Sequence, residues 1–163
     1  MKVLCTAMRR MDEIQQYMMA HARLFGGGTE VVAKLYDDPS YEPLTSYFAK
    51  VEKEGPEGTL LPDYLGECSD CEIAISFYEP YGSEVLDRLP SLRIAGSIRG
   101  GSQHINAEEA TRRGVAVFGT PGRNAHSVSD YTIAMMLVEA RELARNAHSL
   151  WNGQGGEISE RNH

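Results

Sequence analysis

The sequence predicts an α/β protein built on a doubly wound parallel sheet of about five strands, followed by a long C-terminal helix. Short apolar runs alternate along the chain with longer stretches of helical periodicity, which is the order of strand–helix–strand units. Several of these runs are nearly continuous, a pattern typical of strands covered on both faces. The length of 163 residues suits one ordinary domain, and 42% hydrophobic against 24% charged residues is a globular balance.

The charge and cysteine content exclude several classes of protein. The formal net charge is -7, so we expect no nucleic-acid partner and no membrane surface, which would require a basic face. No apolar run approaches the roughly 18 residues of a membrane span, and the N-terminus has no signal-peptide pattern. Three cysteines are too few for a disulfide framework, so we expect a reducing, cytoplasmic setting.

The first half of the chain is predicted to run strand, helix, strand, helix. Residues 2–7 form a short apolar strand. Residues 11–25 are predicted as an amphipathic helix, because apolar residues recur every three or four positions. The glycines at 26–28 end this helix, since glycine adopts the left-handed conformation without a steric penalty. Residues 30–36 form the second strand, and Pro43 opens a helix that ends at Gly55-Pro56.

The middle of the chain repeats this alternation with shorter elements. Residues 57–71 have no clear period and predict a loop with one helical turn near 63–65. The third strand is expected at 72–77 and the fourth at 92–98. Between them, Ser83 is predicted to cap a short helix that runs to Leu89.

A capping pattern marks the next helix. Asn106 lies three residues before Glu109, which resembles a capping box and predicts a helix over 107–113. Gly114 ends that helix, and residues 115–118 form the fifth strand.

The last helix is the longest. Asn124 or Ser127 is expected to open it, and it is predicted to span about 128–150. Residues 133–138 are apolar on every side, so this helix must be covered on more than one face. The polar, glycine-rich residues 151–163 are expected to be a frayed tail.

Metal and redox sites find little support. Cys68-x-x-Cys71 lacks the second ligand pair of a zinc site, and it precedes a strand where a thioredoxin-like pair would follow one. The five histidines have no ligand spacing. We therefore predict no metal site.

Two loops at the carboxyl ends of strands are candidate binding sites. Arg99, Gly100, Gly101 and Ser102 follow the fourth strand, where open α/β sheets bind ligands, and glycine amides suit a carboxylate or phosphate. An ordinary strand-to-helix turn explains this loop equally simply. The second loop, residues 119–124, ends in Asn124, whose amide is suited to position a carboxylate or carbonyl, although it also suits a helix cap. The two loops follow strands that are neighbours in sequence and are expected to face one crevice.

Residues 89–143, LPSLRIAGSIRGGSQHINAEEATRRGVAVFGTPGRNAHSVSDYTIAMMLVEAREL, resemble the D-isomer-specific 2-hydroxyacid dehydrogenases. The resemblance lies in an apolar strand with an Arg-Gly-rich loop, then A-x-x-A-x-x-x-G-V-x-V, T-P-G-x-N and V-[AS]-[DE]-x-T. It implies a flavodoxin-like domain at residues 1–121, an interdomain and dimerisation helix at 122–150 and a tail at 151–163. The first 88 residues match the family less distinctly.

The resemblance also implies site residues. Backbone amides of Gly100, Gly101 and Ser102, with Arg99 beside them, would hold the substrate carboxylate. Asn124 would hold a substrate oxygen, and Val128 would pack near the nicotinamide of the cofactor. Tyr78, Glu79 and Tyr81 are weaker candidates to line the substrate side of the crevice.

The implied activity is hydride transfer between a 2-hydroxy acid and NAD, or NADP, in a dimeric enzyme. The pattern G-x-G-x-x-G is missing, and no residue matches the family's catalytic Arg, Glu or His. We therefore expect a substrate-binding half in which the Rossmann NAD domain is missing, inactive and without bound cofactor as this chain alone. Whether the chain is itself an enzyme stays open. The alternative is a non-catalytic carboxylate-binding or regulatory protein that dimerises through the long helix.

Overall fold

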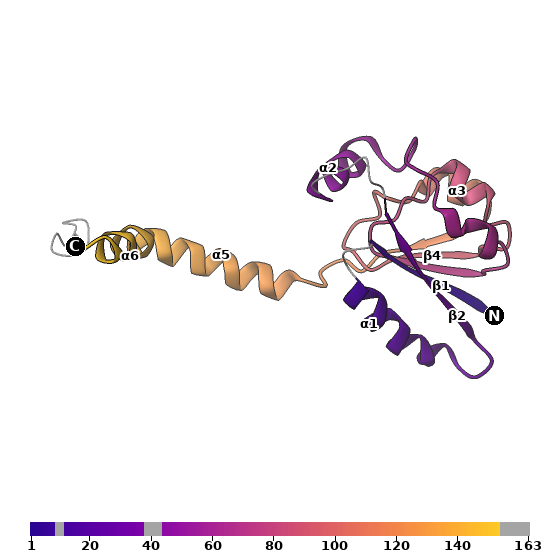
Figure 1. The fold of residues 1–163 in the computed structure, drawn as a ribbon, viewed down its shortest axis with the longest axis horizontal. Helices are drawn as coiled ribbons and strands as arrows, with labels where there is room; N and C mark the ends of the chain where they lie inside the picture. The colour runs from indigo at the N-terminus through magenta and orange to yellow at the C-terminus, as the bar shows by residue number, and fades with distance from the viewer. Residues whose placement is uncertain (9–11, 38–43, 154–163) are drawn as a thin grey trace. The chain divides into compact units, whose positions relative to one another are not determined.

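A parallel five-stranded sheet forms the centre of the computed structural model, which describes residues 1–8, 12–37 and 44–153 (Figure 1). The strands are β1 (Lys2–Met8), β2 (Glu30–Tyr36), β3 (Ile73–Ser76), β4 (Ile94–Ser97) and β5 (Ala116–Phe118). Their order is β2-β1-β3-β4-β5, and all neighbours pair in parallel. This is the doubly wound order of flavodoxin-like folds and confirms the predicted class. The topological switch point lies between β1 and β3, where the chain changes direction across the sheet.

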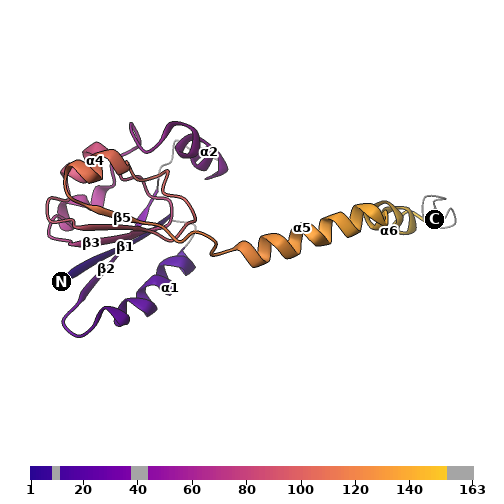
Figure 2. The same cartoon turned by 180° about the vertical axis from the view of Figure 1, so that it is seen from behind.

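Helices lie on both faces of this sheet. They are α1 (Asp12–Ala22), α2 (Leu44–Glu54), α3 (Ser83–Asp87) and α4 (Ala107–Arg112), with short 3-10 turns η1 (Arg23–Phe25) and η2 (Asp63–Glu67). Figures 1 and 2 show α1 on one face and α2, α3 and α4 on the other. Residue 11, the predicted start of the first helix, lies outside the described residues. So does Pro43, which was predicted to open the second helix.

Each face of the sheet has its own hydrophobic cluster. On the α1 side, Val3, Cys5 and Ala7 of β1 pack with Met18. On the other side, a larger cluster includes Leu4 and Met8 together with Tyr47 and Val51 of α2. Successive side chains of a strand point to opposite faces, so β1 is buried on both. This two-sided burial explains the almost continuous apolar runs in the sequence.

The chain divides into two compact units, Met1–Pro121 and Gly122–His163. The first contains the whole sheet. The second contains α5 (Ala125–Ala140) and α6 (Leu143–Trp151). Over the described ranges, no helix has the combination of length and apolar character that crossing a bilayer takes.

The long C-terminal helix is not continuous, which corrects the prediction of one helix over 128–150. Helix α5 ends at Ala140, and Glu142 takes a left-handed conformation with φ 51°. The Glu142 carbonyl then accepts the first bond of α6, from Asn146 N at 2.9 Å, and its carboxylate lies 3.4 Å from Arg145. Neither glycine nor proline marks this break, so the sequence carries no signal for it.

The apolar side chains of α5 are left uncovered within the second unit. No residue of α5 is buried, and Ile133, Met136 and Leu137 are 57%, 67% and 58% exposed. Helix α6 therefore does not cover residues 133–138, which the sequence predicted to be covered on more than one face.

The start of α3 also differs from the prediction, because Ser83 is not its cap. Gly82 occupies the cap position, and Ser83 is the first helical residue. The carboxylate of Glu57 caps the helix instead, accepting from Ser83 N at 3.0 Å and Ser83 Oγ at 2.9 Å. A cap supplied from 26 residues away leaves no local pattern to read.

Candidate functional site

Buried polar side chains gather at the carboxyl-terminal edge of the sheet. Thr6 lies near the carboxyl end of β1, Ser76 ends β3 and Ser97 ends β4, and all three are at most 2% exposed. Parallel strands end at the same edge, so these hydroxyls lie below the loops that follow. The hydroxyl of Ser97 hydrogen-bonds directly to the candidate binding loop, residues 99–102.

Ser97 fixes the backbone of this loop. Its hydroxyl accepts from Arg99 N at 3.1 Å and donates to the Gly101 carbonyl at 3.0 Å. The Arg99 carbonyl in turn accepts from Thr120 N at 2.9 Å and from Thr120 Oγ1 at 3.2 Å. The loops after β4 and β5 are therefore hydrogen-bonded to each other, as their expected proximity requires.

Three consecutive amides of the loop are left free. Within residues 1–8, 12–37 and 44–153, the N–H groups of Gly100, Gly101 and Ser102 donate to no acceptor. A Cβ at Gly101 would lie 2.3 Å from Oε1 of Gln103, so a larger residue there would displace that side chain. Adjacent unpaired amides are donors that suit an anion.

Arg99 adds a positive charge beside these amides. Its guanidinium carbon lies 4.2 Å from the ring centre of Tyr78 and 5.3 Å from that of Phe77. The nearest carboxylate oxygen, Oε1 of Glu52, is 3.6 Å away. That oxygen accepts a hydrogen bond from the Tyr78 hydroxyl. Burial and this bond raise the pKa of Tyr78, so its hydroxyl stays protonated.

His104 supports the loop from below, a role that the sequence gave no reason to expect. It is 1% exposed, its Nε2 lies 3.0 Å from Ser76 Oγ, and its ring stacks on Tyr78 at 5.4 Å between centres. Burial, together with the charge of Arg99, lowers its pKa to about 4. The imidazole is therefore neutral near pH 7.

Glu79 fills the switch point between β1 and β3. Its Oε2 accepts from Thr6 Oγ1 at 2.9 Å and from the backbone N of Phe77 at 2.8 Å and Tyr78 at 3.3 Å. Its Oε1 is buried without a partner among the residues that the structure describes. Burial raises the pKa of this carboxyl, although the hydrogen bonds oppose the shift.

Tyr78, Glu79 and Tyr81 are all buried, which corrects the expectation that they line an open crevice. The continuous run of polar and aromatic residues after β3 gave no sign of this burial. Their place is beneath the loop, where they support it.

The remaining predicted residues lie in the second unit. Asn124 occupies the N-cap position of α5, but its side chain makes no capping hydrogen bond. Val128 is 53% exposed on the first turns of α5. That these two residues approach the loop of residues 99–102 stays a prediction.

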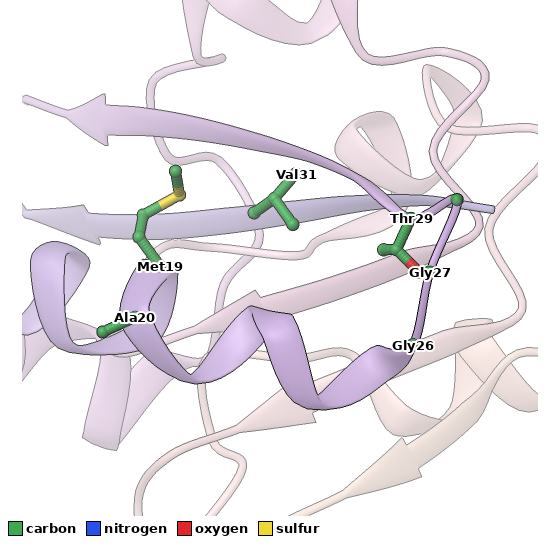
Figure 3. Close-up of a pocket in the computed structure, with 7 residues that line it drawn as sticks. Met19, Ala20, Gly26, Gly27, Thr29 and Val31 are labelled. Atoms are coloured by element: carbon green, nitrogen blue, oxygen red, sulfur yellow. The ribbon is translucent and has the colours of Figure 1, made fainter.

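Other candidate sites are chemically poor. Cys5, Cys68 and Cys71 are buried free thiols, and burial raises the pKa of Cys71 to about 12. The described part of the chain groups no three metal-ligating side chains. A hollow of about 610 Å³ lies between α1 and the start of β2. It is lined by Met19, Ala20, Gly26, Gly27, Gly28, Thr29 and Val31, as the close-up in Figure 3 shows for the labelled residues. It carries no ionisable side chain and lies at the amino end of β2, opposite the polar edge.

The fold is an α/β domain whose sheet has buried polar side chains and a loop with unpaired amides at its carboxyl-terminal edge. Residues 31–155 match the family model for the catalytic domain of D-isomer specific 2-hydroxyacid dehydrogenases. The chain belongs to this family.

Relatives agree with this assignment. The chain is 37% identical over 76 residues to a glyoxylate reductase of Thermococcus kodakarensis, covering 47% of this chain and 23% of the relative. It is 28% identical over 123 residues to a D-3-phosphoglycerate dehydrogenase of Archaeoglobus fulgidus, covering 74% of this chain and 23% of the relative. The chain thus spans about a quarter of the length of these proteins.

Solved structures share the fold. D-lactate dehydrogenase from Aquifex aeolicus, complexed with NAD and lactic acid, aligns over 97% of this chain and 39% of its own, with TM-score 0.64 and 20% identity. An NAD-dependent formate dehydrogenase from Staphylococcus aureus aligns over 99% and 43%, with TM-score 0.64 and 17% identity.

Proposed function

We propose that the chain forms the substrate-binding part of an NAD-dependent D-2-hydroxyacid dehydrogenase. The observation that carries this proposal is the row of amides at Gly100, Gly101 and Ser102, which has no acceptor among the described residues. These amides would bind the carboxylate of a 2-hydroxy or 2-oxo acid, with the charge of Arg99 nearby. Asn124, free of a capping bond, would hold a substrate oxygen.

The cofactor is proposed from the family alone. NAD, or NADP in its place, would accept or supply hydride at C2 of the acid, with Val128 near the nicotinamide. The 163 residues contain no G-x-G-x-x-G, so the chain's own residues do not fit the dinucleotide phosphates. We therefore propose that these residues alone bind the acid without reducing it. Buried free thiols at positions 5, 68 and 71 support a reducing, cytoplasmic setting.

A ligand titration followed by amide NMR tests this function. Pyruvate should shift the amide signals of Gly100, Gly101 and Ser102 with saturation, while NADH should shift none. Gly101→Ala should weaken pyruvate binding by up to about tenfold, because a methyl group beside the amides hinders the close approach of the carboxylate and displaces the side chain of Gln103.

Gly66→Ala is the matched control, since a Cβ at Gly66 meets nothing within 4 Å. It should bind pyruvate like the wild type. A folded chain that binds no 2-oxo acid would refute the proposal. Saturable NADH binding would refute the claim that these residues do not fit the cofactor.

A second candidate is a non-catalytic, dimerising protein of the same family. The exposed side chains of Ile133, Met136 and Leu137 on α5 favour it, because soluble proteins rarely leave such groups uncovered. A second copy of the chain would cover them. Sedimentation analysis should find a dimer for the wild type and a monomer for Leu137→Glu, and a wild-type monomer would rule this candidate out.

A further inference from the structure

Arg99 supplies more binding capacity than one carboxylate requires. A carboxylate offers two oxygens, which three backbone amides already engage well. Arg99 brings a full positive charge and five further N–H donors. None of these donors makes a hydrogen bond within residues 1–8, 12–37 and 44–153, since its contact with Glu52 at 3.6 Å is an ion pair only.

The surroundings of Arg99 leave its side-chain hydrogen-bond donors unpaired among the residues that the structure describes. The rings of Tyr78 and Phe77 lie under the guanidinium, at 4.2 and 5.3 Å, and they offer no hydrogen-bond acceptor in the plane of its fork. Oε1 of Glu52 lies 3.6 Å from Nη2 of Arg99, and the Tyr78 hydroxyl donates to this same oxygen. The side chain of Arg99 is 28% exposed, so its unpaired donors remain within reach of a ligand.

We propose that Arg99 makes the site selective for 2-oxo or 2-hydroxy acids that carry a second anionic group beyond C2. This inference rests on the proposed function, in which the loop amides bind the first carboxylate. A guanidinium binds a carboxylate or a phosphate through two parallel hydrogen bonds, so either group would serve. The aromatic rings restrain the side chain beforehand, which reduces the entropy lost on binding.

The test compares ligands that differ only at their far end. The 163-residue chain is titrated, by amide NMR, with 2-oxopentanoate and with 2-oxoglutarate, which share five carbons and the 2-oxo acid group. Phosphonopyruvate supplies a phosphonate in place of the second carboxylate. We expect at least one dianion to bind about tenfold more tightly than 2-oxopentanoate.

Two variants locate the preference. Arg99→Gln should remove this preference, so that the dianions and 2-oxopentanoate bind the variant with similar affinity. Arg93→Gln removes the same charge from an exposed position just before β4, at the amino-terminal ends of the strands and so opposite the loop. This variant should keep the preference. The amide spectrum of each variant verifies that it is folded.

The outcomes separate the two proposals. Equal binding of mono- and dianions by the wild type overturns this inference and leaves the carboxylate loop standing. An equal loss of all three ligands in Arg99→Gln also overturns it, because Arg99 would then bind the first carboxylate. No binding of any ligand by the folded wild type overturns the proposed function itself.

Discussion

Two buried ionisable residues, Glu79 and His104, lie among the polar groups at the carboxyl-terminal edge of the sheet. Both are at most 1% exposed, and both are hydrogen-bonded to strand-end hydroxyls, of Thr6 and Ser76. Burial favours the neutral form of each, so it raises the pKa of Glu79 and lowers that of His104. Their contributions to stability therefore respond to pH in opposite directions.

Glu79→Gln mimics the protonated carboxyl and should change how stability depends on pH. The pKa of Glu79 is higher in the folded chain than its unfolded value of 4.5. The stability that Glu79 contributes is therefore fully present below pH 4.5 and is lost as the pH rises through the folded-state pKa. The wild type should thus match the variant near pH 4.5 and become less stable than it as pH rises toward 8. Urea unfolding across this range measures the difference, and parallel curves would contradict the expected burial cost.

His104→Gln should show the reverse trend. The lowered folded-state pKa, about 4 against 6.5, means that His104 costs no stability above pH 6.5 and that stability falls between pH 6.5 and 4. The variant should be less stable at pH 7, since it loses the stack on Tyr78. Its deficit should shrink by about 2 kcal/mol between pH 7 and 5. A deficit that is constant with pH would mean that His104 titrates normally.

At the scale of elements, long-range capping ties the loop-bearing half of the sheet together. Asn106 caps α4 by accepting from Glu109 N at 3.0 Å, which confirms the predicted cap, and it also donates to Glu57 Oε1 at 2.6 Å. Desolvation raises the pKa of Glu57, but the bonds from Asn106 and Ser83 outweigh it and lower the pKa overall. One carboxylate thus links the starts of α3 and α4.

Asn106→Ala should destabilise the chain by about 1 kcal/mol, the usual effect of losing a cap. Asn106→Asp keeps the acceptor for Glu109 N but places a second carboxylate beside that of Glu57. The variant's loss of stability relative to the wild type should therefore be largest near pH 7 and should decrease as Glu57 protonates. Chemical denaturation at pH 7 and 4.5 compares the three proteins. A fully stable Asn106→Ala would show that the bonds of Asn106 with Glu109 N and Glu57 contribute nothing to stability.

The order of strands and helices was predictable because it depends on local patterns. Apolar runs, glycine stops and the Asn106 cap each act within a few residues. The break at Glu142 and the cap of α3 by Glu57 were not, since one has no breaker residue and the other joins residues 26 apart. The loop of residues 99–102 was predictable from its glycines, whereas the burial of Glu79 and His104 depends on how β1, β3 and β4 meet.

At the scale of the whole molecule, the sheet and both hydrophobic clusters belong entirely to the first unit, Met1–Pro121. Helix α5 contributes no buried residue. The folding free energy of the sheet should therefore not depend on the second unit.

A chain that ends at Pro121 should unfold cooperatively, with a Tm within a few degrees of the 163-residue chain. Each 1 kcal/mol corresponds to about 4 °C at this size, so the loss of a helix that packs on the sheet would be visible. Thermal unfolding by circular dichroism compares the two. A molten or unfolded fragment would show that α5 completes the first unit.

The two hydrogen bonds from Ser97 to the loop have a kinetic consequence. With Arg99 N and the Gly101 carbonyl both hydrogen-bonded to one hydroxyl, the backbone that carries the three free amides is held in place before any ligand arrives. Capture then requires no slow reshaping of the backbone, so observed association rates should rise linearly with ligand concentration instead of levelling off. Ser97→Ala would release the loop, and its binding should then include a conformational step that the wild type lacks.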